Sequence, residues 1–155
     1  MVKFLMSFFL FLVLNFGALG LGGFLMGSSP AQNTWYFSQN LAPWTPPGWV
    51  FGAAWTLIML LFSVYMTLVW KKNPGKQNAL IYGVHLLLNI GWNPVFFQLH
   101  LVSAGLVILL ALFGVILLTQ QKNFGWKNWN FVLILPYCIW LCIATSLNLY
   151  VLLYN

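Results

Sequence analysis

The sequence contains no aspartate and no glutamate, and its six basic residues are all lysines. Without side-chain carboxylates the chain has no paired acids for glycoside hydrolysis and no Ser-His-acid triad. A carboxylate-bound metal and an acidic proton relay are excluded for the same reason. The chain also shows no phosphate-cradling glycine loop and no Cys/His metal cluster. These absences favour a binding protein without covalent catalytic machinery, and we expect no metal site.

Charge is scarce and apolar residues dominate. Charged residues make up 4% of the 155 residues, whereas 62% are hydrophobic. A soluble domain of this length cannot bury so much apolar surface in one core, so we expect an all-α membrane protein within a lipid bilayer. A basic chain could also suit nucleic acid, but the lysines lie in short segments between apolar runs. We therefore expect no nucleic acid partner.

Five apolar stretches are long enough to cross a bilayer as helices. We expect helices at about 4–26, 49–70, 79–99, 104–119 and 131–153, in a single five-helix transmembrane domain that covers residues 1–155. The first stretch exceeds the apolar part of a secretory signal peptide and lacks a good cleavage site, so it is predicted to span. Its small-residue pairs, Ala18 with Gly22 and Gly23 with Gly27, predict the close approach of another helix.

The positions of the lysines support this number of spans. Five spans place every lysine on one side of the membrane, namely Lys3, Lys71, Lys72, Lys76, Lys122 and Lys127. By the positive-inside rule, that side and the N-terminus face inward, and the loop at residues 27–48 faces outward. This topology suits a bacterial inner membrane.

The loop at 27–48 differs in composition from the other connections. Its stretch from Trp35 to Trp49 holds three tryptophans and three prolines. Proline fixes φ and removes a backbone donor, so the loop is expected to be pre-shaped. Aromatic rings concentrate where the membrane meets water. We therefore predict a lid that packs over a pocket within the membrane.

Polar and aromatic residues recur at helical spacing in three of the expected spans. The predicted stripes are Trp55, Met59, Phe62 and Met66; His85, Asn89, Trp92 and Phe96; and Trp140, Ala144, Leu147 and Asn148. At about 1.5 Å per residue, these stripes converge in the outer half of the bilayer, beneath the lid. Polar groups within a span usually face the bundle or a cavity. Aromatic walls with a few amides suit a flat, largely apolar ligand.

Five further residues leave alternatives open. Kinks at Pro94 and Pro136 either open a cavity or only adjust packing. His85 either takes part in ligand or proton chemistry or is a satisfied buried group. Cys138 and Cys142 are either packing thiols or a metal or redox pair.

Three motifs resemble those of the translocator protein family, also called tryptophan-rich sensory proteins or peripheral benzodiazepine receptors. They are Trp35-Tyr36 with Trp44-Thr45-Pro46-Pro47, Leu86-x-Leu88-Asn89-x-x-Trp92-x-Pro94-x-Phe96-Phe97, and Pro136-Tyr137-x-x-Trp140 with Leu147-Asn148. The resemblance implies a five-helix bundle, commonly a homodimer, that binds porphyrins, haem and hydrophobic drugs. The resemblance implies that the protein requires no cofactor and that porphyrin or haem is its ligand. Some bacterial relatives are reported to degrade protoporphyrin with light and oxygen.

The resemblance also implies which residues bind the ligand. Together with Asn148 from the stripe analysis, the ligand-binding residues are predicted to be Trp35, Tyr36, Trp55, Asn89, Trp92, Phe96, Trp140, Ala144, Leu147 and Asn148. Trp55 and Trp140 would be catalytic only if the protein degrades porphyrin. The family's usual lysine in the lid is missing, which removes a charged contact with a ligand carboxylate. Tyr150 and Tyr154 are followed by no basic residue, so we do not predict cholesterol binding.

Three functions remain possible from the sequence. The leading hypothesis is a receptor or sensor for tetrapyrroles and drug-like hydrophobic ligands. The second is an enzyme that breaks down porphyrin with light and oxygen. The third is a transporter of such ligands, although a coupled transporter is disfavoured because the chain shows neither inverted repeats nor charges within its spans.

Overall fold

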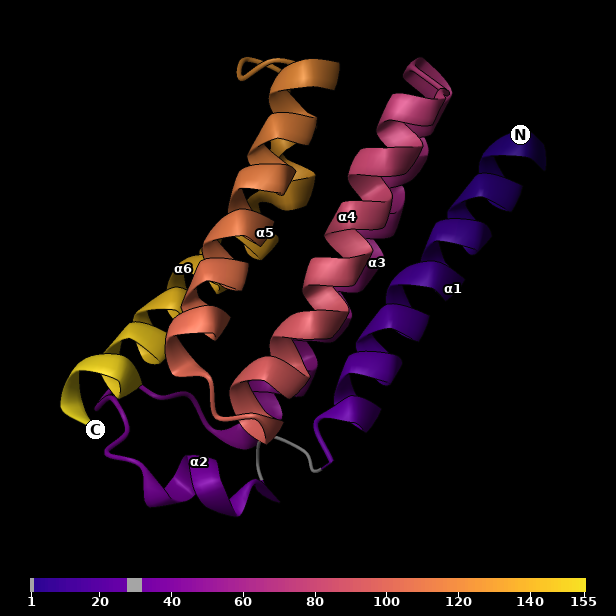
Figure 1. Cartoon of the computed structure of the whole chain (residues 1–155). Coiled ribbons are helices and arrows are strands. Elements are labelled where there is room, and N and C mark those ends of the chain that lie inside the picture. The colour runs from indigo at the N-terminus through magenta and orange to yellow at the C-terminus, as the bar shows by residue number, and fades with distance from the viewer. Residues whose placement is uncertain (1, 28–31) are drawn as a thin grey trace.

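The computed structural model describes residues 2–27 and 32–155, and it is built from helices that run side by side (Figure 1). The long elements are α1 (Val2–Leu25), α3 (Gly48–Lys72), α4 (Lys76–Asn93), α5 (Val102–Asn123) and α6 (Phe131–Tyr154), and the π-helical turn η2 (Pro94–Gln98) continues α4. The short helix α2 (Thr34–Ser38) lies across one end of the bundle (Figure 1). Within the described ranges, five helices are long and apolar enough to span a membrane. The prediction of an all-α, five-helix membrane protein is confirmed.

Two helices extend further than the sequence patterns indicate. We expected the fourth span to end at residue 119, but α5 continues to Asn123. Gln120 and Asn123 of this last turn are polar yet buried, and Asn123 both donates to the carbonyl of Thr119 at 2.9 Å and accepts from Asn78 Nδ2 at 2.9 Å. Helix α4 likewise begins at Lys76, three residues before the expected start. In both cases, polar residues that suggested a loop are held in helices by contacts between helices.

The lid contains more structure than the sequence indicated. Residues 28–31 of the predicted lid lie outside the described residues. The remainder includes α2, which begins after Asn33, whose side chain accepts a hydrogen bond from the amide of Tyr36 at 2.8 Å. This is a conventional N-cap, which compensates for the short length of the helix.

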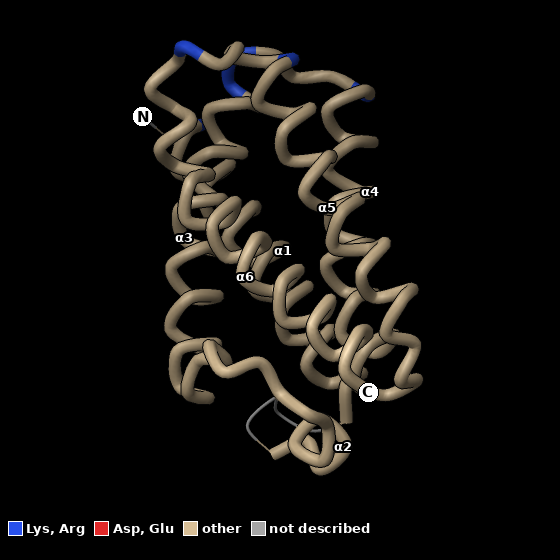
Figure 2. Tube along the Cα trace, turned by 90° about the vertical axis from the view of Figure 1, so that its left-hand side faces the viewer, with Lys and Arg blue, Asp and Glu red and all other residues tan. Residues whose placement is uncertain are grey.

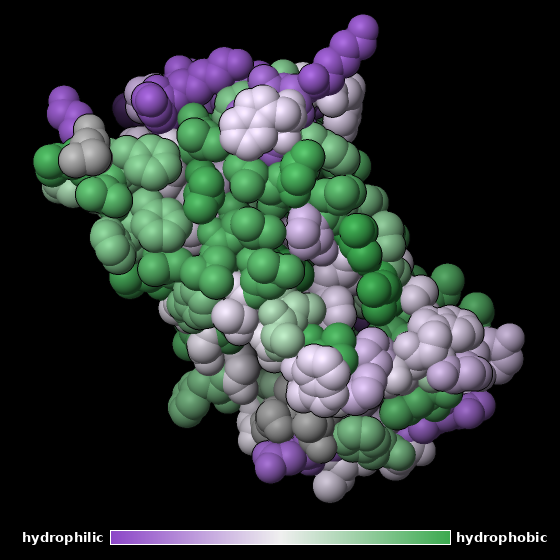
Figure 3. All heavy atoms as spheres, turned by 180° about the vertical axis from the view of Figure 1, so that it is seen from behind, coloured by the Kyte–Doolittle hydropathy of each residue, from purple (hydrophilic) through white to green (hydrophobic). Residues whose placement is uncertain are grey.

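The two ends of the bundle differ in charge. All lysines lie at one end, and α2 lies at the other (Figure 2). Apolar side chains cover most of the middle of the face seen in Figure 3, with hydrophilic residues gathered towards the two ends. Large exposed apolar residues such as Phe9, Leu87 and Val107 continue this surface around the bundle. The protein is an integral membrane protein.

Buried hydrogen bonds join α1, α3 and α4. Asn15 is fully buried, donates to Ser63 Oγ at 2.9 Å and accepts from the Tyr82 hydroxyl at 2.8 Å. Apolar burial cannot drive helices together in lipid as it does in water, so such bonds and close packing provide the association.

Close packing between α1 and α4 involves one of the predicted small-residue pairs. Ala18 and Gly22 are buried, and a Cβ on Gly22 would lie 2.8 Å from Asn93 Nδ2. Gly22 therefore permits the approach of α4 that the pattern predicted. Of the second pair, Gly23 has open space around its Cβ position, whereas a Cβ on Gly27 would lie 3.0 Å from Gln98 Oε1 in η2.

The two prolines within spans behave differently. Helix α6 continues through Pro136 to Tyr154. At Pro94 the helix widens, since the amide of Leu99 donates to the Pro94 carbonyl five residues earlier at 2.9 Å. The wider turn buries the adjacent side chains of Phe96 and Phe97 together. Pro94 thus marks a local change of helix type that shapes the interior.

Candidate functional site

Three indole rings from three different helices line one small cavity near the lid. Trp55 comes from α3, Trp92 from α4 and Trp140 from α6. We call this space the inner cavity, and its lining residues are Tyr36, Phe51, Trp55, Trp92, Phe96, Phe97, Trp140, Ala144, Leu147 and Asn148. Eight of the ten predicted ligand-binding residues are among them. The structure therefore brings the three predicted stripes together.

The rings around the inner cavity pack against one another in regular geometries. Phe51 meets Trp140 edge to face with centroids 5.3 Å apart. Trp92 stacks on Phe96 at 5.7 Å and 10°. Trp55 meets Tyr137 edge to face at 5.8 Å. Such contacts fix ring orientation and add to the stability that apolar burial provides.

The lid covers the inner cavity through Tyr36 of α2. This side chain is buried and meets Phe97 edge to face at 5.5 Å and Phe96 at 6.0 Å. Burial raises the pKa of Tyr36, while a hydrogen bond with Thr45 opposes that shift. The phenol is therefore neutral at physiological pH, as its place over an aromatic cavity requires.

Trp35 does not line the inner cavity. Its indole stacks on His100 at 4.2 Å and 16°, and it meets Phe96 edge to face at 5.5 Å. His100, which has φ of +58°, lies in the turn between η2 and α5. Trp35 therefore links the lid to this turn without lining the inner cavity. Its ring contacts Phe96, which does line the cavity.

The other half of the lid is held by α6. The amide of Asn40 donates to Asn155 Oδ1 at 2.7 Å, and Asn155 Nδ2 donates back to the Asn40 carbonyl at 3.3 Å. Trp44 Nε1 donates to Ser146 Oγ at 3.1 Å. These three bonds fasten the lid to one helix of the bundle.

Two polar side chains in the cavity wall lack hydrogen-bond partners among the described residues. They are Asn148, through both its amide nitrogen and its oxygen, and Trp92, through Nε1. Asn148 is 1% exposed and Trp92 is 8% exposed. Nearly all buried polar groups in proteins are paired, and an unpaired one costs about 1–3 kcal/mol. The wall therefore presents unused donors and an unused acceptor in an otherwise aromatic space.

Asn89 lies in a separate polar layer. Its Nδ2 donates to the Tyr137 hydroxyl at 2.7 Å, and the same hydroxyl is 3.1 Å from His85 Nε2. Asn89 is therefore occupied within the bundle and does not line the inner cavity. His85 is buried between Phe62 and Tyr82. Its Nδ1 has no hydrogen-bond partner among the described residues, so the structure satisfies this residue only in part.

Three residues of this region were not predicted from the sequence. Phe51 and Phe97 line the inner cavity. Gly105 in α5 lies behind it, where a Cβ would stand 2.9 Å from Asn148 Nδ2 and 3.3 Å from Phe96. Phe51 lies four residues before Trp55 and so belongs to its stripe. Nothing in the sequence indicated Gly105, because its importance depends on the contact between two helices.

The inner cavity has a small volume. Its volume is about 20 Å³, which is enough for about one water molecule. A second cavity of about 240 Å³ lies between the lid and the start of α3, and we call it the outer cavity. Tyr36 and Phe51 line both cavities. These two rings therefore form the wall between them.

Among residues 2–27 and 32–155, no group of three or more His, Cys, Asp or Glu side chains is placed to hold a metal ion. Cys138 and Cys142 are both free thiols, the first buried and the second exposed.

Comparison with known proteins gives a consistent result. The sequence profile of the TspO/MBR family matches residues 8–154. The chain is 31% identical to "Tryptophan-rich protein TspO" of Chlorobaculum tepidum over 89% of both chains. It is 32% identical to "Tryptophan-rich sensory protein" of Cereibacter sphaeroides over 79% of this chain and 77% of the relative. It is 31% identical to "Translocator protein" of Homo sapiens over 74% of this chain and 70% of the relative.

Proposed function

The chain belongs to the TspO/MBR family, and from this membership and the geometry of the inner cavity we propose that it is a membrane receptor for porphyrin, haem-like tetrapyrroles and similar flat hydrophobic ligands. One observation carries the proposal: an aromatic cavity contains two buried polar side chains, Asn148 and Trp92, that lack partners within residues 2–27 and 32–155. A macrocycle offers broad faces for indoles and polar groups at its edge. A bound macrocycle would therefore stack on the indole rings and give hydrogen-bond partners to Asn148 and Trp92.

The proposal requires the cavity to open. A volume of about 20 Å³ cannot hold a macrocycle, so the walls must separate when the ligand enters. Movement of Tyr36 and Phe51 would join the inner cavity to the outer cavity of about 240 Å³. We propose that the ligand enters between the lid and α3, and that it selects a conformation in which these two rings have moved apart.

Quenching of tryptophan fluorescence by protoporphyrin tests the site. Trp55→Ala with Trp140→Ala removes two cavity indoles and is expected to abolish saturable quenching. Trp126→Ala with Trp129→Ala is the matched control, because both rings are exposed and line no part of the inner cavity. Titration curves for the Trp55/Trp140 variant that match those of the parent protein would reject the proposed site.

Porphyrin breakdown driven by light and oxygen is a second candidate. Trp55 and Trp140 both line the inner cavity, and indoles are readily oxidised. A porphyrin stacked there would place its excited state beside both rings. The test compares the rate at which porphyrin absorbance bleaches under light with the parent protein and with Trp55→Phe. Equal rates would leave binding alone.

We further propose that the lysine end faces the cytoplasm of a bacterial cell and that the lid faces outward. The complete segregation of lysines supports this orientation under the positive-inside rule (Figure 2). The test uses a chain whose two cysteines are replaced by serine, with either Asn40→Cys or Lys127→Cys added. A membrane-impermeant maleimide applied to intact cells should label only the first. Labelling of the second alone would invert the orientation.

A further inference from the structure

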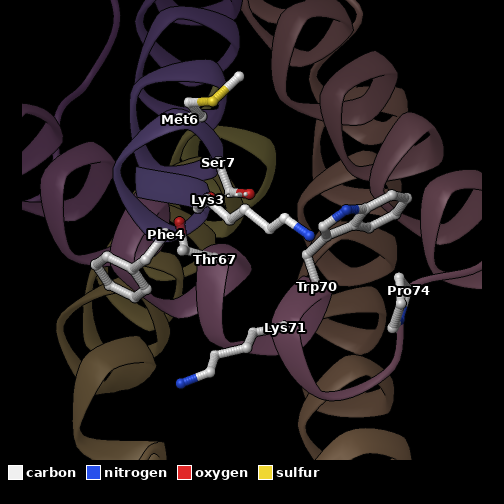
Figure 4. Close-up of a pocket in the computed structure, with 8 residues that line it drawn as sticks. All are labelled: Lys3, Phe4, Met6, Ser7, Thr67, Trp70, Lys71 and Pro74. Carbon is white, nitrogen blue, oxygen red and sulfur yellow. Dashed lines mark hydrogen bonds between the residues drawn. The ribbon is translucent and has the colours of Figure 1, made fainter. Parts of the chain in front are cut away.

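A larger cavity lies at the end of the bundle opposite the lid. Its volume is about 550 Å³, and it is formed where the first turns of α1 approach the last turns of α3 (Figure 4). Lys3 and Ser7 line it from α1, and Thr67, Trp70 and Lys71 line it from α3. We call it the basic cavity. It shares no residue with the inner or the outer cavity.

The basic cavity carries positive charge that the chain itself does not neutralise. Two of its lining residues are lysines, and the sequence contains no aspartate or glutamate. In Figure 4 the Lys3 side chain extends towards the Trp70 indole, whereas Lys71 extends away from it. No side chain of this protein can supply an anion to this site, so the anion must come from another molecule.

The hydroxyl groups of the cavity are already engaged as donors. Ser7 Oγ donates to the carbonyl of Lys3 at 3.0 Å, and Thr67 Oγ1 donates to the carbonyl of Ser63 at 2.8 Å. The remaining donors are the lysine ammonium groups and the indole N–H of Trp70, together with backbone amides of the first turn of α1 that have no partner within the helix. Charge, rather than a network of hydroxyls, would select the ligand.

The rest of the cavity wall is apolar and continues onto the outer surface of the bundle. Phe4 and Met6 line the cavity, and they are 36% and 68% exposed. These side chains belong to a helix that is long and apolar enough to span a membrane, so we expect them to face acyl chains. The site thus joins a cationic rim to a surface for hydrocarbon.

We propose that the basic cavity binds an anionic phospholipid, with its phosphate at the rim that Lys3 and Lys71 form and its acyl chains along Phe4 and Met6. Lys71, which extends away from Trp70 in Figure 4, would turn towards the phosphate on binding. Basic pockets between transmembrane helices commonly bind acidic head groups. A free phosphate would use only the rim and would leave the apolar wall without a partner. The chemistry of both parts therefore favours a whole lipid.

The test measures the retention of phosphatidylglycerol and phosphatidylcholine by the purified protein with native mass spectrometry. The parent protein should retain phosphatidylglycerol in preference to phosphatidylcholine. Each lysine near a lipid head group contributes about a fivefold gain in affinity. Lys3→Gln with Lys71→Gln should therefore bind phosphatidylglycerol about 25-fold more weakly.

Two further variants separate a site from general attraction. Lys122→Gln with Lys127→Gln removes the same charge at the same end and should leave retention unchanged. Ser7→Trp keeps every lysine but fills the cavity, and it should reduce retention. Helix content and melting temperature show that each variant is folded.

Three results would overturn the proposal. The first is an equal loss with both lysine pairs, which would indicate attraction to charge alone. The second is equal retention of the two lipids by the parent protein. The third concerns competition for bound phosphatidylglycerol. If glycerophosphoglycerol, which has no acyl chains, displaced it at the same concentration as added phosphatidylglycerol does, the site would recognise the anion without its acyl chains.

Discussion

Asn148 and Gly105 approach each other closely, since a Cβ at position 105 would stand 2.9 Å from Asn148 Nδ2 and would require a neighbouring atom to shift. This contact lets α5 pass close to α6 while the amide of Asn148 lies in the wall of the inner cavity. The amide has no partner among the described residues. The protein therefore maintains an energetically unfavourable group at the place where we propose that a ligand binds.

Asn148→Val is expected to stabilise the protein and to weaken ligand binding. Removing an unpaired buried amide should raise the free energy of unfolding by about 1–2 kcal/mol. Losing its contacts with the ligand should lower affinity for protoporphyrin by about a factor of ten. Thermal unfolding in detergent and fluorescence titration measure the two effects. Asn89→Val is the control, because it breaks the bond to Tyr137 and should destabilise the protein instead. Lower stability of Asn148→Val would show that the amide has a structural partner.

Phe51→Ala is expected to speed ligand entry. Phe51 and Tyr36 form the wall between the inner and the outer cavity, and removing one ring joins the two spaces. Stopped-flow mixing with protoporphyrin should therefore show a higher association rate constant. Leu57→Ala on the same helix is the control, because Leu57 is 50% exposed and lines neither cavity. Unchanged association kinetics in Phe51→Ala would place the entrance elsewhere.

Asn155→Ala is expected to loosen the lid. The substitution removes both hydrogen bonds to the backbone of Asn40 but leaves the bond from Trp44 to Ser146 in place. Hydrogen exchange at the amide of Asn40 should rise by about fivefold, since a hydrogen bond contributes about 1 kcal/mol. The melting temperature of the bundle should change little. Asn128→Ala at the lysine end should leave lid exchange unaffected, and an equal rise in that variant would exclude a specific fastening.

Asn15→Val is expected to destabilise the bundle. Asn15 links α1 to both Ser63 in α3 and Tyr82 in α4. Hydrogen bonds between transmembrane helices contribute about 0.6–1.7 kcal/mol, so losing two should lower the free energy of unfolding by about 1–2 kcal/mol. A double-mutant cycle with Tyr82→Phe measures the coupling directly. Additive effects of the two substitutions would show that this bond makes no contribution.

The number of spans and most of the inner cavity were predictable, because each depends on a repeating pattern. Length and hydropathy predict the spans, and helical spacing brings Trp92 and Trp140 onto inward faces. The position of Asn89 was harder to predict, because spacing shows which face a residue occupies but not which partner it finds there. Asn89 meets Tyr137 and is used within the bundle.

Features that depend on contacts between helices were not predictable from local patterns. The extra turn of α5 is held by the pairing of Asn123 with Asn78. The wide turn after Pro94 changes the helical period, so both Phe96 and Phe97 face inward where a regular helix would separate them by about 100°. The small volume of the inner cavity also depends on how side chains of different helices pack together, which the spacing of residues along one helix does not show.

The absence of aspartate and glutamate has a consequence for behaviour in acid. Most proteins unfold at low pH because carboxylates that are paired in the native state take up protons. This chain has no such side chains, and apart from its two histidines its side-chain charge stays constant from neutrality to strongly acidic solution. The carboxylate part of acid denaturation is therefore missing, and acid can act on the folded bundle mainly through His85, a buried imidazole that must take up a charge.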